Sequence, residues 1–327
     1  MTDKIIVIDC LGADAGPEIA IKGIADGLKE LKDISYALVG PKSLIEAKLK
    51  ELNADTSRVE IVDANETISN FENPMNGIMS KPNASLVKAM KLVGTDEKYI
   101  GLITAGSSGA ILVGSVRFLL DEKRTRPCMA AILPNALEAY TCVVDTGASI
   151  DVDSYQLHEF AKLGSDFMKK LYKIDNPKVG LLSNGAEKTK GNKLVKETYP
   201  LLEADESLNF VGNIEGNKAL SGDCDVLVCD GFAGNQVLKN TEGMAKNLIT
   251  DIVKYSKKNN RPEFMEVAQY LMAKYDISSL GGAFVLGARK TVVKARGNSN
   301  EKTFANLSRM LFNYHEGTSI YKNKYLK

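Results

Sequence analysis

Short stretches rich in glycine, serine, asparagine and lysine follow several apolar runs of this 327-residue sequence. Residues 183–192 read SNGAEKTKGN, and residues 230–235 read DGFAGN. Glycine lets backbone N–H groups approach a ligand closely, and the N–H groups at a helix start have partial positive charge. Such stretches are suited to bind a small anion such as phosphate, although any one of them alone is more simply explained as a turn.

Charge distinguishes the stretch at residues 183–192 from the others. Lys188 and Lys190 lie there, within a few residues of Asn184 and Gly185. A lysine ammonium in this position can pair with phosphate as a point charge. The alternative, a lysine that is simply solvated on an exposed loop, stays open from this segment alone.

Other kinds of catalytic chemistry have little support in the residue types. The two histidines, His158 and His315, lie outside the glycine-rich stretches, so a Ser-His-Asp arrangement is not indicated. Neither GxGxxG nor GxxxxGK[ST] occurs, which argues against dinucleotide and P-loop nucleotide binding. The cysteines have no CxxC spacing and lie in or beside apolar runs, which predicts core residues rather than disulfides or metal ligands. They are Cys10, Cys128, Cys142, Cys224 and Cys229.

The composition is that of an ordinary globular protein, with 44% hydrophobic and 25% charged residues. A formal net charge of +1 gives no reason to expect a nucleic acid partner. No run approaches the roughly 18 apolar residues of a membrane span. The N-terminus resembles a short strand rather than a signal peptide, which predicts a cytoplasmic protein.

Apolar, β-branched runs alternate with helix-like segments along the whole chain. Examples of the runs are KIIVIDC at residues 4–10, YIGLITAG at 99–106 and KVGLLSNG at 178–185. This alternation predicts an α/β fold with three layers, in which helices cover both faces of a mostly parallel sheet. No linker is evident, so we expect residues 1–327 to form a single two-lobed catalytic domain, with the polar stretch at 256–264 protruding.

Ligands of such sheets bind beyond the carboxyl ends of the strands, so the loops that follow the strands are the candidate site. Several small polar loops on one sheet edge are harder to explain as turns than a single loop. The loops are residues 9–17, 104–110, 145–149, 183–192, 212–216, 230–235, 281–287 and 294–300.

Taken in this order, these loops resemble those of the acyl-ACP:phosphate acyltransferase (PlsX) family. The closest matches are VGLLSNGAEKTKGN, NFVGNIEG and DVLVCDGFAGNQVLKNTEG, and the resemblance covers nearly the whole chain. It implies transfer of an acyl group from acyl carrier protein to inorganic phosphate for phospholipid synthesis. It also implies a homodimer without metal or cofactor, and the fold of phosphate acetyltransferases and isocitrate/isopropylmalate dehydrogenases.

The resemblance implies roles for particular residues. Phosphate is itself a nucleophile, so the protein must position it and stabilise an oxyanion. We expect Lys190 to hold phosphate, and Asn235 to orient phosphate or donate a hydrogen bond to the oxyanion. The residues expected to bind phosphate or substrate are Asp9, Gly12, Asp14, Gly106, Ser107, Ser108, Asn184, Gly185, Asn192, Asp230, Gly231, Gly281 and Gly282.

The sequence departs from the family pattern at several of these loops. Ala13 and Ala15 replace a glycine and a polar residue of the first loop, and Arg296 replaces a histidine. A basic run after Pro74 is reduced to Lys81. The segment before GGAFVLG is short and polar where relatives have an apolar hairpin, which weakens the case for membrane contact.

These departures leave several alternatives open. One is a paralogue that makes short-chain acyl phosphate or acetyl phosphate, and another is a binding protein that has lost catalysis. A decarboxylating dehydrogenase of related fold would need a metal-binding aspartate cluster, which the sequence does not show. The residues also leave open the length of the acyl chain and the donor, either acyl carrier protein or a coenzyme A thioester.

Overall fold

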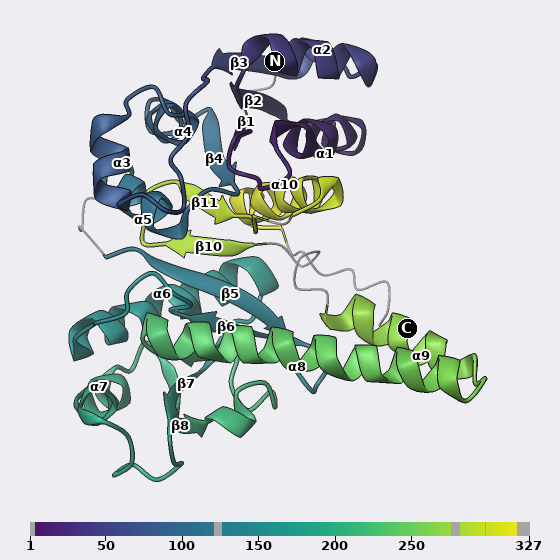
Figure 1. Ribbon diagram of the computed structural model, residues 1–327. Coiled ribbons are helices and arrows are strands. Elements are labelled where there is room, and N and C mark those ends of the chain that lie inside the picture. Colours follow the sequence, from purple (N-terminus) through teal and green to yellow (C-terminus); the bar gives the residue numbers. More distant parts are fainter. Residues whose placement is uncertain (1–3, 121–125, 276–281, 298, 319–327) are drawn as a thin grey trace. The chain divides into compact units, whose positions relative to one another are not determined.

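A computed structural model describes residues 4–120, 126–275, 282–297 and 299–318 of the chain (Figure 1). The chain divides into two compact units. Unit 1 contains residues 1–129, 169–174 and 281–327, and unit 2 contains residues 130–168 and 175–280. Unit 1 is therefore assembled from both ends of the chain, and most of unit 2 comes from its middle.

Unit 1 contains the strands β1 (Ile5–Asp9), β2 (Ser35–Gly40), β3 (Val59–Asp63), β4 (Tyr99–Thr104), β10 (Ala283–Leu286) and β11 (Thr291–Lys294). Their order in the sheet is β3-β2-β1-β4-β11-β10. Neighbours pair in parallel, except for the antiparallel pair of β10 and β11. Because β1, β2 and β4 are buried along their whole length, they are continuous apolar runs rather than alternating patterns.

The helices of unit 1 are α1 (Pro17–Glu30), α2 (Lys42–Glu51), α3 (Pro74–Ser80), α4 (Ser85–Val93), α5 (Ser108–Phe118) and α10 (Glu301–Glu316). Helix α1 packs against α10, and α4 packs against β1 and β4. Figure 1 shows α1 and α10 on one side of this sheet and α4 and α5 on the other. Local sequence sets the helix starts, since Pro17 opens α1 and Asn300 forms a capping box with Thr303 at α10.

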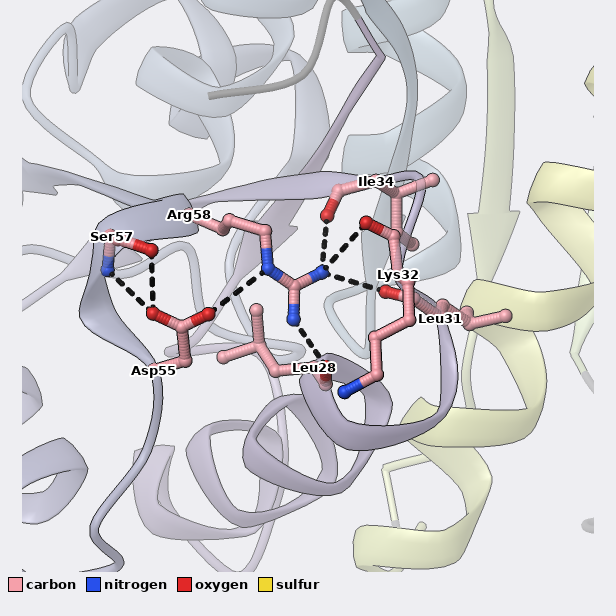
Figure 2. A network of polar contacts seen from close by, with 7 residues as sticks. All are labelled: Leu28, Leu31, Lys32, Ile34, Asp55, Ser57 and Arg58. Carbon is pink, nitrogen blue, oxygen red and sulfur yellow. Dashed lines mark hydrogen bonds and ion pairs between the residues drawn. The ribbon is translucent and has the colours of Figure 1, made fainter.

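One partly buried arginine closes the carboxyl end of α1 (Figure 2). Arg58 is the last residue of a short 3₁₀ turn. Its guanidinium donates hydrogen bonds to four backbone carbonyls in and after the last turn of the helix. Its Nε also pairs with Asp55 at 3.3 Å. The last carbonyls of a helix lack partners within the helix, so Arg58 supplies them. The four carbonyls belong to Leu28, Leu31, Lys32 and Ile34.

The strands of unit 2 are β5 (Cys128–Pro134), β6 (Tyr140–Val144), β7 (Lys178–Ser183), β8 (Asn209–Glu215) and β9 (Val226–Val228), with the first two residues of β5 counted in unit 1. Their order is β5-β6-β9-β7-β8. The pairs β6–β9, β7–β9 and β7–β8 are parallel, and β5–β6 is antiparallel. The mostly parallel pairing that the sequence predicts is thus present in both units.

The helices of unit 2 are α6 (Ser154–Tyr172), α7 (Lys193–Ala204), α8 (Gly231–Lys258) and α9 (Glu263–Tyr275), with the last residues of α6 counted in unit 1. The first turns of α8 cover an apolar core that includes Val143, Leu227 and Cys229. Further along, α8 packs against α9 as a helical hairpin. The stretch at 256–264, expected to protrude, contains the exposed connection of this hairpin at residues 259–262, while Ser256 at its start is buried.

Candidate functional site

The loop that begins α8 lies against the turn that follows β6. The backbone N–H of Gly231 donates to the carbonyl oxygen of Ser149 at 2.8 Å. The side-chain amide of Asn235 donates to the carbonyl oxygen of Thr146 at 3.3 Å. The DGFAGN loop and the DTGAS turn, 85 residues apart in the sequence (230 − 145), are therefore neighbours at the carboxyl edge of the unit 2 sheet.

Close packing of these two segments explains both glycines of DGFAGN. A Cβ atom on Gly234 would lie 1.9 Å from the carbonyl oxygen of Asp145, and one on Gly231 would lie 2.7 Å from that of Ser149. Real Cβ atoms do not approach backbone this closely. Both positions therefore need glycine for packing, whether or not a ligand is present.

A buried carboxylate shapes the DTGAS turn. Asp145 is fully buried, and its side-chain oxygens accept hydrogen bonds from three successive backbone N–H groups. The donors are Gly147 at 3.1 Å, Ala148 at 3.0 Å and Ser149 at 2.6 Å. Since Asn235 and Gly231 both contact this turn, Asp145 indirectly positions the start of α8.

Asp230 serves as the N-cap of α8. Its Oδ1 accepts a hydrogen bond from the backbone N–H of Ala233 at 2.8 Å. The carboxylate thus already accepts a hydrogen bond from one of the free N–H groups at this helix start. It also supplies the negative charge that the helix dipole favours there. Whether a substrate anion also binds at DGFAGN stays a prediction.

The two lysines of the 183–192 loop have different surroundings. The ammonium of Lys188 is paired with Glu203 and lies 5.3 Å from the centre of the Tyr199 ring. Lys190 is exposed and forms no ion pair with any residue that the structure describes. A Cβ atom on Gly185 would lie 2.7 Å from Cγ of Lys190, so glycine makes room for the lysine stem. Of the two, Lys190 is the lysine available to a ligand.

Two amides hold this loop and join it to α7. Oδ1 of Asn184 accepts from the N–H of Gly191 at 2.9 Å, and Gly191 has a φ of +103° that favours glycine. Oδ1 of Asn192 accepts from the N–H of Val195 at 2.9 Å and so caps α7. The helix that follows Lys190 therefore begins with a neutral cap.

A cavity of about 460 Å³ lies beside this loop, within the range of small-molecule sites. Its walls come from β7, from the starts of α6, α7 and α8, and from the end of β9. Leucine, valine, cysteine and alanine side chains form most of the lining. The polar side chains in the lining are Ser183, Asn184, Asn192 and Asp230.

The predicted site residues of unit 1 surround a buried aspartate. Asp9 is 1% exposed and accepts hydrogen bonds from Ser85 Oγ at 2.6 Å and Thr104 Oγ1 at 2.7 Å. Burial raises the pKa of the Asp9 carboxyl, and these hydrogen bonds oppose that rise. Because Thr104 Oγ1 also accepts from the N–H of Gly106 at 3.0 Å, Asp9 connects the loops at 9–17 and 104–110. The carboxyl positions these loops from inside.

Close backbone packing accounts for further glycines of unit 1. A Cβ atom on Gly12 would lie 2.5 Å from the nitrogen of Gly106, and one on Gly282 would lie 1.6 Å from the carbonyl oxygen of Lys294. The N–H of Asp14 donates to the carbonyl oxygen of Gly297 at 2.9 Å. The loops at 9–17, 104–110 and 294–300 therefore gather at one edge of the unit 1 sheet. Ser107 and Ser108 lie partly exposed at the start of α5, and Gly281 lies outside the described residues.

The cysteines lie in the core, as their apolar surroundings in the sequence predict. All five cysteines are buried, and none forms a disulfide within the described ranges. Burial raises the pKa of the Cys229 thiol well above its usual value. His158 pairs with Asp205 at 2.7 Å. In the described ranges, three or more His, Cys, Asp or Glu side chains nowhere gather in a group that could hold a metal ion. None of the helices in these ranges has the length and apolar character that crossing a membrane requires.

Residues 5–309 match the family model described as fatty acid synthesis protein. The chain belongs to this family. A phosphate acyltransferase of Clostridium perfringens (strain SM101 / Type A) is 38% identical over 323 residues, which cover 97% of this chain and 95% of that protein. A phosphate acyltransferase of Clostridium tetani (strain Massachusetts / E88) is 35% identical, over 96% and 95% of the two chains. The family predicted from the loops is confirmed.

Solved structures share the fold. A phosphotransacetylase from Streptococcus pyogenes aligns with a TM-score of 0.63 over 96% of this chain and 94% of that chain, at 15% identity. This likeness confirms the predicted α/β fold of the phosphate acetyltransferase type.

The structure brings the predicted residues together in two groups, one in each unit. Asp9, Gly12, Asp14, Gly106, Ser107, Ser108 and Gly282 belong to unit 1, and Asn184, Gly185, Lys190, Asn192, Asp230, Gly231 and Asn235 belong to unit 2. Of the buried polar residues that hold the loops, Asp9 is among the predicted residues, whereas Thr104, Asp145 and Ser85 are not. Thr104 and Asp145 lie at strand ends, where position alone could have indicated them. Ser85 lies 76 residues from its partner Asp9, and no sequence signal connects the two.

Proposed function

We propose that this protein transfers an acyl group from a thioester to inorganic phosphate and so produces an acyl phosphate. The observation that carries the proposal is Lys190, an exposed lysine with no ion-pair partner among the described residues, on a loop that borders a mostly apolar cavity. The ammonium suits phosphate, and the cavity suits an apolar acyl group. The family membership and the shared name of the two relatives support this activity.

The reaction balances without a cofactor. An oxygen of HPO₄²⁻ forms a bond to the thioester carbonyl carbon, and the carbonyl becomes an oxyanion. The oxyanion collapses, the carbon–sulfur bond breaks, and the leaving thiolate takes the proton that phosphate brought. The products are an acyl phosphate and a free thiol. The protein must hold two reactants in contact and stabilise an oxyanion, which backbone N–H groups and amides can do.

Within this scheme Lys190 holds phosphate, and Asn235 orients phosphate or donates to the oxyanion. Asn235 is partly buried, and its amide is already fixed by the carbonyl of Thr146. A side chain held in this way is preorganised, which lowers the cost of ordering it during the reaction. Asn184, Gly185 and Asn192 shape the loop around Lys190.

The residues of unit 1 have supporting roles in this proposal. Asp9 positions the first loop from inside the protein, and Gly12, Asp14, Gly106, Ser107 and Ser108 present backbone and hydroxyl groups to substrate. Gly231, Asp230, Gly281 and Gly282 complete the set expected from the sequence. The proposal treats residues 1–327 as a single two-lobed catalytic domain.

We further propose that the donor is acyl carrier protein, that the product enters phospholipid synthesis, and that the protein is a cytoplasmic homodimer. The family description, fatty acid synthesis protein, supports the link to lipid metabolism. A coenzyme A thioester is the alternative donor, because both carriers present their acyl group on the same kind of thioester arm.

A donor panel tests the proposed activity. Purified protein is incubated with inorganic phosphate and acyl-ACP or acyl-CoA donors from short to long, and acyl phosphate is trapped as hydroxamate. We expect a long-chain product, formed much more slowly by Lys190→Ala and by Asn235→Ala than by the wild type. A product from acetyl donors alone would instead indicate a short-chain enzyme. No product from any donor would overturn the enzymatic proposal and leave a binding protein of this fold.

A further inference from the structure

The floor of the cavity in unit 2 is apolar and well buried. Leu157 of α6, Leu181 of β7, Val195 of α7 and Cys229 after β9 all line it, and none is more than 9% exposed. Leu194 and Ala233, from the first turns of α7 and α8, are partly exposed and complete the apolar surface. Such a floor favours hydrocarbon over a hydrated ion.

The acidic and amide side chains of the lining are already committed to the backbone. Asn184, Asn192 and Asp230 each use Oδ1 to accept an N–H of a neighbouring residue. They shape the edges of the cavity, and Asp230 adds a negative charge. A phosphate dianion in the cavity would face that charge and the apolar floor, so phosphate belongs outside it, at Lys190.

Ser183 differs from the other polar residues of the lining. It is 9% exposed, and its Oγ has no hydrogen-bond partner among the residues that the structure describes. It lies where β7 ends and the 183–192 loop begins, and its Oγ would be 3.4 Å from a Cβ atom placed on Gly191. A buried hydroxyl without a partner is unfavourable. The Oγ atom is closed to solvent, so a rotation of the side chain about its Cα–Cβ bond would bring it to a group that enters the cavity.

We propose that this cavity is the site for the acyl group of the thioester donor, with Ser183 Oγ donating a hydrogen bond to the carbonyl oxygen. The inference rests on the proposed phosphate acyltransferase activity and locates its acyl site. An acyl group matches the cavity because it combines one hydrogen-bond acceptor with an apolar chain. Gly191 and Asn184 line the cavity and lie beside Lys190 in the loop, so phosphate held by Lys190 would be close to the carbonyl carbon.

Ala233 offers a test of the acyl site that does not depend on turnover. Ala233→Leu adds side-chain volume to the cavity from the partly exposed first turn of α8, and Ala204→Leu makes the same change at the exposed end of α7, outside the cavity. Calorimetry without phosphate would measure binding of decanoyl-ACP against unacylated holo-ACP, and of decanoyl-CoA against CoA. We expect the decanoyl group to tighten binding at least 10-fold in the wild type and in Ala204→Leu. Ala233→Leu should lose most of that gain.

Two binding results would overturn the assignment of the acyl site. One is a wild type that binds neither decanoyl thioester more tightly than its unacylated carrier. The other is a decanoyl gain that Ala233→Leu retains or that both leucine variants lose equally. The hydroxamate assay on the wild type is a separate measurement. A protein that binds the decanoyl group in this cavity but makes no acyl phosphate would contradict the proposed function and leave the acyl site standing.

Ser183→Ala tests the hydrogen bond to the carbonyl. The infrared band of a ¹³C=O label in bound decanoyl thioester should lie at lower frequency in the wild type than in Ser183→Ala, because a hydrogen bond weakens the C=O bond. We expect kcat/KM for the donor to fall about 10-fold with KM for phosphate unchanged. Equal carbonyl frequencies in the two proteins would remove Ser183 from the proposed site.

Discussion

Replacing Lys190 with alanine should reduce kcat/KM for phosphate about 30-fold. Two unit charges 4 Å apart attract by about 1 kcal/mol in water and about 4 kcal/mol near a protein surface. These energies correspond to roughly 5-fold and roughly 1,000-fold in a rate ratio. Lys190 is exposed to solvent, which places the expected effect in the lower half of this range. The loss should appear mainly in the phosphate dependence, since the donor does not contact the ammonium in our scheme.

Lys188→Ala is the matched control. It removes the same charge from the same loop, but the ammonium of Lys188 is already paired with Glu203. Initial rates by the hydroxamate assay, over a range of phosphate concentrations at low ionic strength, should show less than about a 2-fold effect for this variant. Added salt should narrow the difference between wild type and Lys190→Ala, because screening weakens exposed charge interactions. Similar losses in both variants, or none in Lys190→Ala, would refute the assignment of Lys190.

Three further predictions concern stability and can be measured as shifts in urea unfolding. Gly234→Ala should destabilise by about 3 kcal/mol because its Cβ would overlap the carbonyl of Asp145, whereas Gly243→Ala, with open space in the same helix, should stabilise by up to about 1 kcal/mol. Asp9→Asn should gain stability relative to wild type at neutral pH. The difference in unfolding free energy between the two proteins should shrink as pH falls through the raised pKa of Asp9. Below that pKa the buried carboxyl of the folded wild type is protonated and neutral, like the asparagine amide. Arg58→Met should cost about 2–3 kcal/mol by leaving carbonyls at the end of α1 without their charged donor.

The sheets could be predicted because their strands are buried on both faces. The segments at β1, β2 and β4 are buried throughout and mostly apolar, and a nearly continuous apolar run bounded by glycine-rich loops indicates a parallel strand. The position of the candidate loops follows from the same property, since they come after strands that run in parallel.

Distant partners explain what the sequence could not show. The glycines of DGFAGN indicate an anion loop when the segment is considered alone, but in the structure the turn after β6 packs against them. No local pattern indicates that Asp145 will approach residues that come 86 and 89 positions later (231 − 145 and 234 − 145). Likewise, Ser183 has the sequence of a simple strand end. Its importance comes from a buried hydroxyl with no hydrogen-bond partner among the described residues, which only the three-dimensional structure shows.

The starts of α7 and α8 are suited to different parts of the proposed reaction. Helix α8 begins with Asp230, whose carboxylate satisfies a backbone N–H and offsets the positive end of the helix dipole. Helix α7 begins with Asn192, a neutral cap that leaves the dipole uncompensated, and Lys190 lies two residues before it. A phosphate is therefore favoured near the start of α7. The start of α8 instead forms part of the wall of the apolar cavity, where Ala233 lies in the lining. In our scheme, phosphate therefore binds at the 183–192 loop and the acyl group binds in the cavity that this loop borders. The two reactants meet at the loop, which is the contact that acyl transfer requires.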